Sequence, residues 1–130
     1  MPKGQCHCGA VRYEMPSETQ HKAVCHCHDC RRHSGAPLVA WGLVAKDELS
    51  VTGETREYAS SEHGRRHFCP RCGTALFYTN DQVFPGLIDV QIATLDDPDA
   101  IEPDMQVQTA DRIRWVDRLG EMTAFERYPG

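Results

Sequence analysis

Apolar and polar residues alternate over short stretches of the chain, and Gly, Pro and Asp residues separate these stretches. The alternation is clearest over 11–15 and 87–92, and the most apolar run covers 37–41 and 43–44. A period of two places successive side chains on opposite faces of a strand. We therefore predict strands at these places, with the apolar run as the central strand of the core.

Shorter extended segments complete this pattern. Segments 49–52 and 55–59 flank Gly53, which predicts a hairpin, and 29–34 is long enough for a single helical turn. Helical periodicity is weak elsewhere, so we expect a mainly β protein. Further strands are predicted over 22–25, 65–68, 74–78 and 105–109.

Length and charge narrow the classes of function. The 130 residues contain no linker or repeat, which predicts one domain over 1–130. A net charge of -5 argues against nucleic acid as a partner. The apolar run over 37–45 is far shorter than the roughly 20 residues of a membrane span, and the N-terminus has no apolar signal core. We expect a cytoplasmic protein that does not interact with membranes.

Seven cysteines form three clusters along the chain, and the sequence has no signal for secretion. In a reducing compartment, closely spaced cysteines bind metal more often than they form disulfides. Short spacings such as C-x-C and C-x-x-C let two thiolates of one turn converge on one ion. The clusters are Cys6 with Cys8, the triple Cys25, Cys27 and Cys30, and Cys69 with Cys72.

The seven cysteines can be assigned to metal sites in two ways. Four can close a structural site, with the triple holding a second metal at a site that has one open position. Alternatively, two cysteines of the triple join Cys69 and Cys72, which leaves Cys6 and Cys8 as a redox pair. Thiolate-rich sites suit zinc or iron, but seven cysteines do not make two four-cysteine iron–sulfur clusters. We therefore expect two zinc ions per chain.

Three segments resemble the family of glutathione-dependent formaldehyde-activating enzymes and the related domain of centromere protein V. They are 4–13, 25–37 and 68–74, and each contains one cysteine cluster. The order and separation of these segments match the family, and the resemblance covers nearly the whole chain.

The resemblance implies a fold and a division of the cysteines. The fold is Mss4-like, with several short coiled antiparallel sheets around the zinc sites. Cys6, Cys8, Cys69 and Cys72 would bind the structural zinc, and Cys25, Cys27 and Cys30 would bind the second, open zinc.

The resemblance also implies a carbon–sulfur lyase that joins glutathione to formaldehyde. Another thiol or small aldehyde, or cleavage of such adducts, fits the same site. A non-catalytic zinc-binding interaction module is the alternative from another class, and a redox- or metal-sensing protein is a third. Motifs of serine hydrolases, kinases and dinucleotide-binding proteins are missing from the sequence.

Glutathione carries two carboxylates, so its binding site requires hydrogen-bond donors. Arg31 and Arg32 follow the triple directly and could hold a carboxylate bidentately, and Ser34 offers a hydroxyl. These three residues are the expected substrate contacts. No general acid or base is identified. Because a small β domain with spare edge strands often pairs with a second copy, a homo-oligomer is a further expectation.

Overall fold

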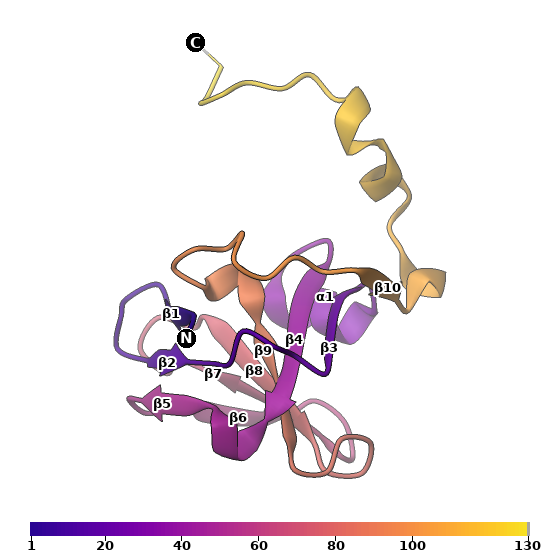
Figure 1. Cartoon of the computed structure of the whole chain (residues 1–130). Coiled ribbons are helices and arrows are strands. Elements are labelled where there is room, and N and C mark those ends of the chain that lie inside the picture. Colours follow the sequence, from indigo (N-terminus) through magenta and orange to yellow (C-terminus); the bar gives the residue numbers. More distant parts are fainter. Residues whose placement is uncertain (130) are drawn as a thin grey trace.

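Two sheets build the part of the chain that the computed structural model describes, residues 1–129 (Figure 1). The smaller sheet has the strand order β1-β2-β5, and both of its pairings are antiparallel. Its strands are β1 (Lys3–Gln5), β2 (Arg12–Glu14) and β5 (Ser50–Thr52). The strand predicted over 11–15 is confirmed as β2, and the fold class is mainly β as expected.

The larger sheet has the order β10-β3-β4-β9-β8-β7-β6, and only β10 and β3 pair in parallel. The apolar run predicted as the central strand is β4, which pairs with strands on both sides. The members are β3 (His21–Cys25), β4 (Val39–Ala45), β6 (Arg56–Ala59), β7 (Gly64–Phe68), β8 (Ala75–Asn80), β9 (Leu87–Gln91) and β10 (Met105–Val107).

The larger sheet has two different faces, because successive residues of a strand point to opposite sides. Val44, Val90 and Phe77 contribute to the main core, which also includes Val11 and Met15 from the region of the smaller sheet. The opposite face contributes a second cluster, made of Cys25, Cys27, Cys30, Val39, Trp41 and Tyr78. One cysteine cluster therefore lies on the face away from the main core.

The predicted hairpin around Gly53 is wrong. Although β5 and β6 both form, β5 pairs with β2 in the smaller sheet and β6 pairs with β7 in the larger one. Gly53 has a φ of 92°, and a Cβ there would collide with the carbonyl oxygen of Ala10. The glycine therefore lets the chain pass close to the first cysteine turn as it crosses between the sheets.

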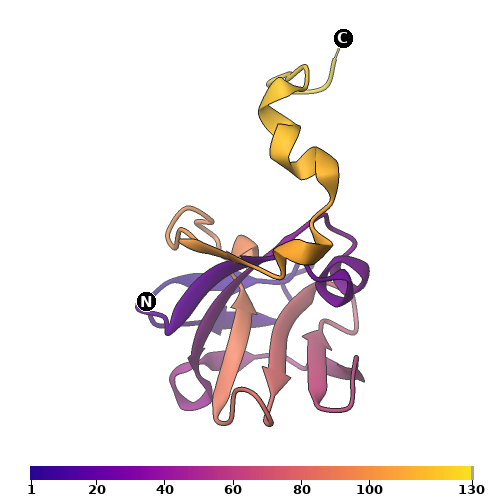
Figure 2. The same ribbon diagram turned by 90° about the vertical axis from the view of Figure 1, so that its right-hand side faces the viewer.

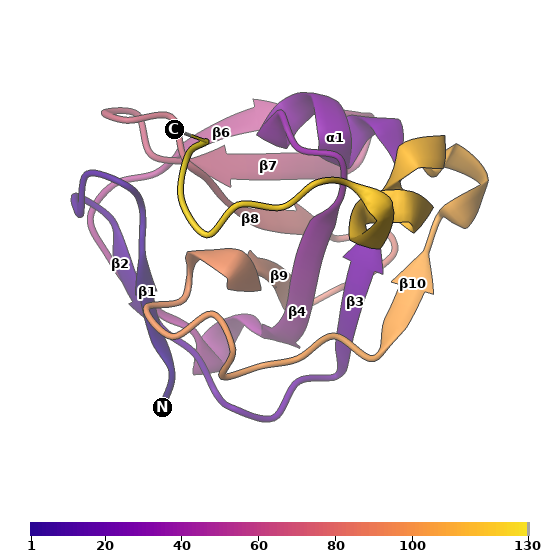
Figure 3. The same cartoon turned by 90° about the horizontal axis from the view of Figure 1, so that it is seen from above.

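The helix α1 (His28–Ser34) follows β3 directly, as Figure 3 shows from above. It has seven residues where the sequence predicted one turn. Cys27 caps its start, accepting a hydrogen bond from the Cys30 N–H at 3.3 Å, and Gly35 ends it with a φ of 64°. These caps satisfy backbone groups at both ends and account for the extra length.

The segment after β10 extends away from both sheets (Figure 2). It consists of 3-10 turns, including Thr109–Asp111 and Arg114–Glu121, and further 3-10 turns cover Lys46–Glu48 and Ile92–Thr94. Trp115, which lies in this segment, has 41% of its surface exposed. Among residues 1–129 there is no helix of the length and apolar character that crossing a membrane would require.

Candidate metal centres and an adjoining cavity

Four cysteines from distant parts of the chain meet at one point. Cys6 and Cys8 lie in the turn after β1, and Cys69 and Cys72 lie in the turn after β7. Their four Sγ atoms all lie within 4.8 Å of one another, and Cys8 and Cys69 are 3.8 Å apart at Sγ. All four are free thiols rather than disulfides.

These distances fit a tetrahedral metal site. A zinc–sulfur bond of about 2.3 Å places two sulfurs of a tetrahedron about 3.8 Å apart. The Sγ atoms of Cys6 and Cys8 are 3.7 Å apart. Backbone N–H groups of Val11 and Arg71 donate to the sulfurs of Cys6 and Cys69, which favours the thiolate form. The residues present can therefore hold a metal with four protein ligands.

Cys72 shows how the turn stabilises its thiolate. Hydrogen bonds from the hydroxyl and the backbone of Thr74 lower the pKa of Cys72 to about 5. The hydroxyl oxygen of Thr74 lies 3.2 Å from the Cys72 sulfur. A cysteine that is already ionised at neutral pH does not have to release a proton when it binds a metal.

The triple forms the second cluster. Cys25 ends β3, Cys27 is the cap of α1, and Cys30 lies in its first turn. The three Sγ atoms lie within 4.8 Å of one another, and those of Cys25 and Cys30 are 3.7 Å apart. Hydrogen bonds from Cys25 and Cys30 hold the pKa of Cys27 well below its ordinary value. This donor set can bind a metal with three protein ligands, which leaves one position open in a tetrahedral site.

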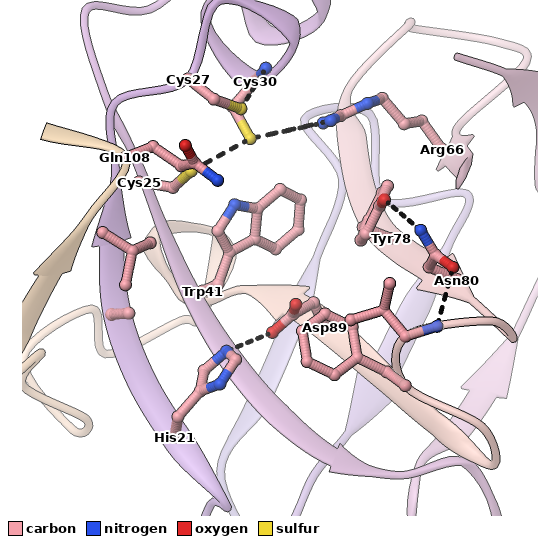
Figure 4. Close-up of a pocket in the computed structure, with 14 residues that line it drawn as sticks. His21, Cys25, Cys27, Cys30, Trp41, Arg66, Tyr78, Asn80, Asp89 and Gln108 are labelled. Carbon is pink, nitrogen blue, oxygen red and sulfur yellow. Dashed lines mark hydrogen bonds and ion pairs between the residues drawn. The ribbon is translucent and has the colours of Figure 1, made fainter. Parts of the chain in front are cut away.

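The open side of the triple borders a cavity of about 290 Å³ (Figure 4). Its wall is largely aromatic and aliphatic, and its basic and acidic side chains besides the cysteines and Tyr78 are His21, Arg66 and Asp89. The lining residues include Ala23, Trp41, Tyr78, Val83, Phe84 and Val107, with the amides of Asn80 and Gln108. A site of this kind binds a small molecule with few, specific polar contacts.

Arg66 is a buried cation at the cysteine end of the cavity, with 4% of its surface exposed. Its Nη1 and Nη2 donate to the sulfur of Cys30 at 3.6 and 3.7 Å, and its guanidinium lies 4.7 Å above the ring of Tyr78. Within residues 1–129 it has no carboxylate within 4.0 Å. Because a buried charge needs a partner, the thiolates of the triple are the anions that balance it.

A histidine–aspartate pair lies elsewhere in the same cavity. His21 Nε2 is 3.2 Å from Asp89 Oδ1, and the aspartate has 5% of its surface exposed (Figure 4). Burial raises the pKa of Asp89 to about 6, although His21 opposes the effect. A perturbed carboxyl in a cavity is typical of functional sites.

The expected substrate contacts lie outside this cavity. Arg31 and Arg32 line a separate shallow hollow beside Trp115, and the Nε of Arg31 donates to the backbone oxygen of His26. Ser34 accepts a hydrogen bond from the side chain of Gln91 at 2.9 Å. Their role in substrate binding stays a prediction.

His26, which lies between two cysteines of the triple, is fully buried. Its Nε2 is 2.9 Å from the side-chain oxygen of Gln106 in β10, and its Nδ1 has no hydrogen-bond partner within residues 1–129. The contact fastens the cysteine loop to β10. His26 does not line the cavity of the triple.

Sequence analysis did not single out Arg66, Asp89, His21 or Gln108. One signal was present for Asp89, a charged residue in the middle of an otherwise apolar alternation. Arg65 and Arg66 carry a weaker signal, since two adjacent arginines in a strand cannot both point to solvent when one face is covered. Gln108 has a φ of 58°, which is unusual for a residue with a Cβ. Its residue type alone predicts neither this conformation nor its position in the cavity wall.

Comparison with known proteins identifies the family. The family model described as glutathione-dependent formaldehyde-activating enzyme matches residues 1–111. A lyase of Schizosaccharomyces pombe, named as uncharacterized, is 31% identical over 114 residues, which cover 77% of this chain and 83% of that protein.

A Halomonas elongata protein, named as a candidate glutathione-dependent formaldehyde-activating enzyme, is 34% identical over 72% of this chain and 65% of its own length. A Penicillium rubens protein with the same name is 31% identical over 78% of this chain and 56% of its own length. The matched region thus spans less than two thirds of these two relatives.

A crystal structure of a Rhodobacter sphaeroides protein supports the fold. It superimposes with a TM-score of 0.64 over 81% of this chain and 99% of that one, at 24% sequence identity. The extent of the family match, together with these relatives, shows that the chain belongs to the family of glutathione-dependent formaldehyde-activating enzymes.

Proposed function

We propose that the chain binds two zinc ions and is a carbon–sulfur lyase that acts at the triple. Its substrates would be a thiol such as glutathione and formaldehyde or a related small aldehyde. In the forward direction a C–S bond forms, the carbonyl π bond breaks, and the thiol proton ends on the former carbonyl oxygen. The reverse direction cleaves the adduct, and neither direction changes an oxidation state.

The family match and the names of the relatives support this class of reaction. The spacing of the sulfurs supports the metal, because both clusters have the separations of a tetrahedral thiolate site. Soft thiolate donors favour zinc over magnesium or calcium. Cys6, Cys8, Cys69 and Cys72 would hold the structural ion, and Cys25, Cys27 and Cys30 the ion beside the cavity.

The observation that carries the proposal is the position of the triple on the wall of a largely apolar cavity. Cys25, Cys27 and Cys30 would hold the zinc ion, which would supply a lowered thiol pKa and so favour the nucleophilic thiolate at this position. Trp41 and Tyr78 line the cavity, with their ring centroids 6.1 Å apart. Confinement of a thiol and an aldehyde together favours their addition, since it replaces a bimolecular encounter.

Arg66 would balance the charge of the loaded site. Three thiolates and a divalent ion leave one negative charge, and the guanidinium beside Cys30 neutralises it. The site would then accept an anionic thiolate with less repulsion than an unbalanced one. This is the role we assign to the buried arginine in the proposed reaction.

The rate at which glutathione and formaldehyde exchange with their adduct tests the proposal, because the addition also proceeds without a catalyst. Exchange spectroscopy by NMR measures this rate at equilibrium. We expect the zinc-loaded protein to accelerate exchange, and Cys27→Ser to abolish the acceleration while it retains the structural metal. Asp47→Asn changes an exposed residue that does not line the cavity; it is the control and should behave as the unaltered protein.

Equal exchange rates with and without the zinc-loaded protein would contradict the lyase. If the protein binds glutathione without accelerating exchange, a thiol-binding protein is the correct description. If Cys27→Ser accelerates exchange as well as the unaltered chain does, the reaction does not take place at the triple.

A further inference from the structure

The cavity beside the triple has a polar end that the reaction itself does not need. His21 and Asp89 form this end, and both line the same cavity as Cys25, Cys27 and Cys30 (Figure 4). The register of the sheet explains why they meet. His21 pairs with Leu43, and Leu43 pairs with Asp89 on the next strand, so the three residues form one row across the sheet.

The same register separates this pair from the cysteines. His21 and Cys25 lie four residues apart on β3 and on the same face, which corresponds to about 13 Å along the strand. Trp41, on the neighbouring strand, lies between the two ends (Figure 4). A proton donor or acceptor at His21 is therefore too distant to act on a sulfur held at the triple.

Asp89 nevertheless has the features of a ligand-binding group. Its Oδ1 is 3.2 Å from His21, and its other oxygen, Oδ2, has no hydrogen-bond partner within residues 1–129. Oδ2 is also not one of the fully covered polar atoms that lack a partner, so it is accessible from the cavity. A largely buried carboxylate with one free oxygen facing a cavity can accept a hydrogen bond from a ligand there.

The charge of this end of the cavity determines which kind of hydrogen-bond donor binds there. Arg66 is the permanent cation of the cavity wall, and Cys30 and Tyr78 already contact its guanidinium. The polar end is thus anionic when Asp89 is ionised, and a cationic donor binds there more strongly than a neutral one. An ammonium group satisfies both the charge and the free oxygen.

We propose that His21 and Asp89 form a recognition site for the ammonium group of an amine-bearing thiol whose sulfur lies at the triple. The inference rests on the proposed function, because it assumes a thiol at that end. Asp89 then determines which thiols bind rather than how fast the bond forms.

The length of the cavity selects among such thiols. A ligand that reaches both ends must separate sulfur and nitrogen by on the order of 10 Å, given the strand spacing. In glutathione eight bonds separate the cysteine sulfur from the γ-glutamyl ammonium, which spans roughly 9–10 Å when extended. Cysteamine has only three bonds between the two atoms and cannot reach both ends.

The test compares two thiols that differ in one group. Glutarylcysteinylglycine is glutathione without the ammonium, and calorimetry of the zinc-loaded protein measures the affinity of each. We expect roughly tenfold tighter binding of glutathione, because a charge-assisted hydrogen bond is lost in the analogue. In Asp89→Asn the preference should fall to less than about twofold, whereas the affinity for cysteamine should not change.

Asp47→Asn is the matched control, with the same change of charge on an exposed side chain outside the cavity. It should retain the full preference. Equal affinities of the two tripeptides for the unaltered protein would overturn the inference, even if Asp89→Asn fails to fold. A preference that survives in Asp89→Asn would overturn it as well.

The outcomes separate this inference from the proposed function. If the zinc-loaded protein binds neither tripeptide, both are wrong. If it binds both equally and accelerates exchange with formaldehyde, the lyase stands and only the ammonium site is wrong.

Discussion

Arg66 directs both terminal nitrogens of its guanidinium at the sulfur of Cys30, at 3.6 and 3.7 Å. The two residues are 36 positions apart, on β7 and on α1. Because Arg66 is held in place by the packing of β7, its position fixes a positive charge beside the sulfurs of the triple. It also makes the ionisation of the sulfurs sensitive to a residue that binds no metal itself.

Substitution of Arg66 should weaken metal binding at the triple. Arg66→Gln removes the positive charge that helps to keep the pKa of Cys27 low. Loss of a group that supports a metal ligand typically costs about 10–100-fold in affinity. Competition with a chromophoric chelator measures the affinity of each site. Arg66→Lys should be intermediate, because an ammonium does not reproduce the two parallel N–H donors.

The four-cysteine site serves as the internal reference for this measurement. Its affinity should stay within about twofold in both Arg66 variants, since Arg66 donates to no sulfur of that cluster. Unchanged affinity at the triple would show that the guanidinium acts only in packing against Tyr78.

Removal of one cysteine from each cluster should separate the two metal sites. Cys27→Ser should lower the zinc content from about two ions to about one. The melting temperature should be nearly retained, because the closed four-ligand site, and not the open three-ligand site, is the structural one. Cys8→Ser should lower the melting temperature strongly, because it breaks the closed site that joins two distant turns. Elemental analysis and thermal unfolding measure the two effects.

The opposite ranking would contradict this division of the cysteines. A chain that unfolds in Cys27→Ser and remains stable in Cys8→Ser would make the triple the structural site. One zinc ion in both the unaltered protein and Cys27→Ser would show that the triple does not hold the metal.

Asp89→Asn should stabilise the fold, increasingly so at higher pH. Burial raises the pKa of Asp89 from 3.8 to about 6, so the folded protein binds this proton more tightly than the unfolded chain does. The stability that this proton contributes is complete below about pH 3.8 and is lost as the pH rises through about 6. At pH 7.5 the ionised side chain therefore costs at most about 3 kcal/mol.

Chemical denaturation of the unaltered protein and Asp89→Asn between pH 4.5 and 7.5 measures this difference. The stabilisation by asparagine should grow with pH and level off above about pH 7. A difference that does not vary with pH, or one that shrinks as the pH rises, would contradict the raised pKa. A stabilised variant that loses its preference among thiols would show that the carboxylate is retained for binding at a cost in stability.

Two glycines with positive φ offer a matched comparison of backbone constraints. At Gly53 an added Cβ would collide with the carbonyl of Ala10, whereas at Gly86, with a φ of 75°, it would meet nothing within 4 Å. Gly86→Ala should cost about 1 kcal/mol from the backbone conformation alone. Gly53→Ala should cost at least about 2 kcal/mol, because the first cysteine turn must also shift. Urea denaturation compares the two; equal costs would contradict the close approach.

Much of the fold and of the metal sites follows from local features of the sequence. Alternation predicted β2 and β9, since a period of two identifies a strand wherever one face is buried, and the most apolar run of the chain predicted β4. Short cysteine spacings predicted which residues share a turn, because two ligands that close together need no distant partner to converge. The helix after the triple was predicted too short, since its caps depend on the conformations of Cys27 and Gly35.

Pairing between distant segments could not be predicted in the same way. The strands around Gly53 read as a hairpin because they are adjacent in sequence, yet each pairs with a strand from elsewhere. Local propensity does not specify the partner of a strand, since the decisive energy comes from side chains across the sheet. The cavity has the same origin, because six strands, the helix α1 and the segments between them contribute to its wall.

The sequence by itself determined the composition of the cysteine turns, the mainly β architecture and the acidic charge, all of which depend on neighbouring residues or on simple sums. Only the tertiary structure brought Cys8 to Cys69, Arg66 to Cys30 and His21 to Asp89. The physical reason is register. A shift of one residue between two strands would turn Arg66, His21 or Asp89 to the opposite face, and the packing of the core decides which register holds.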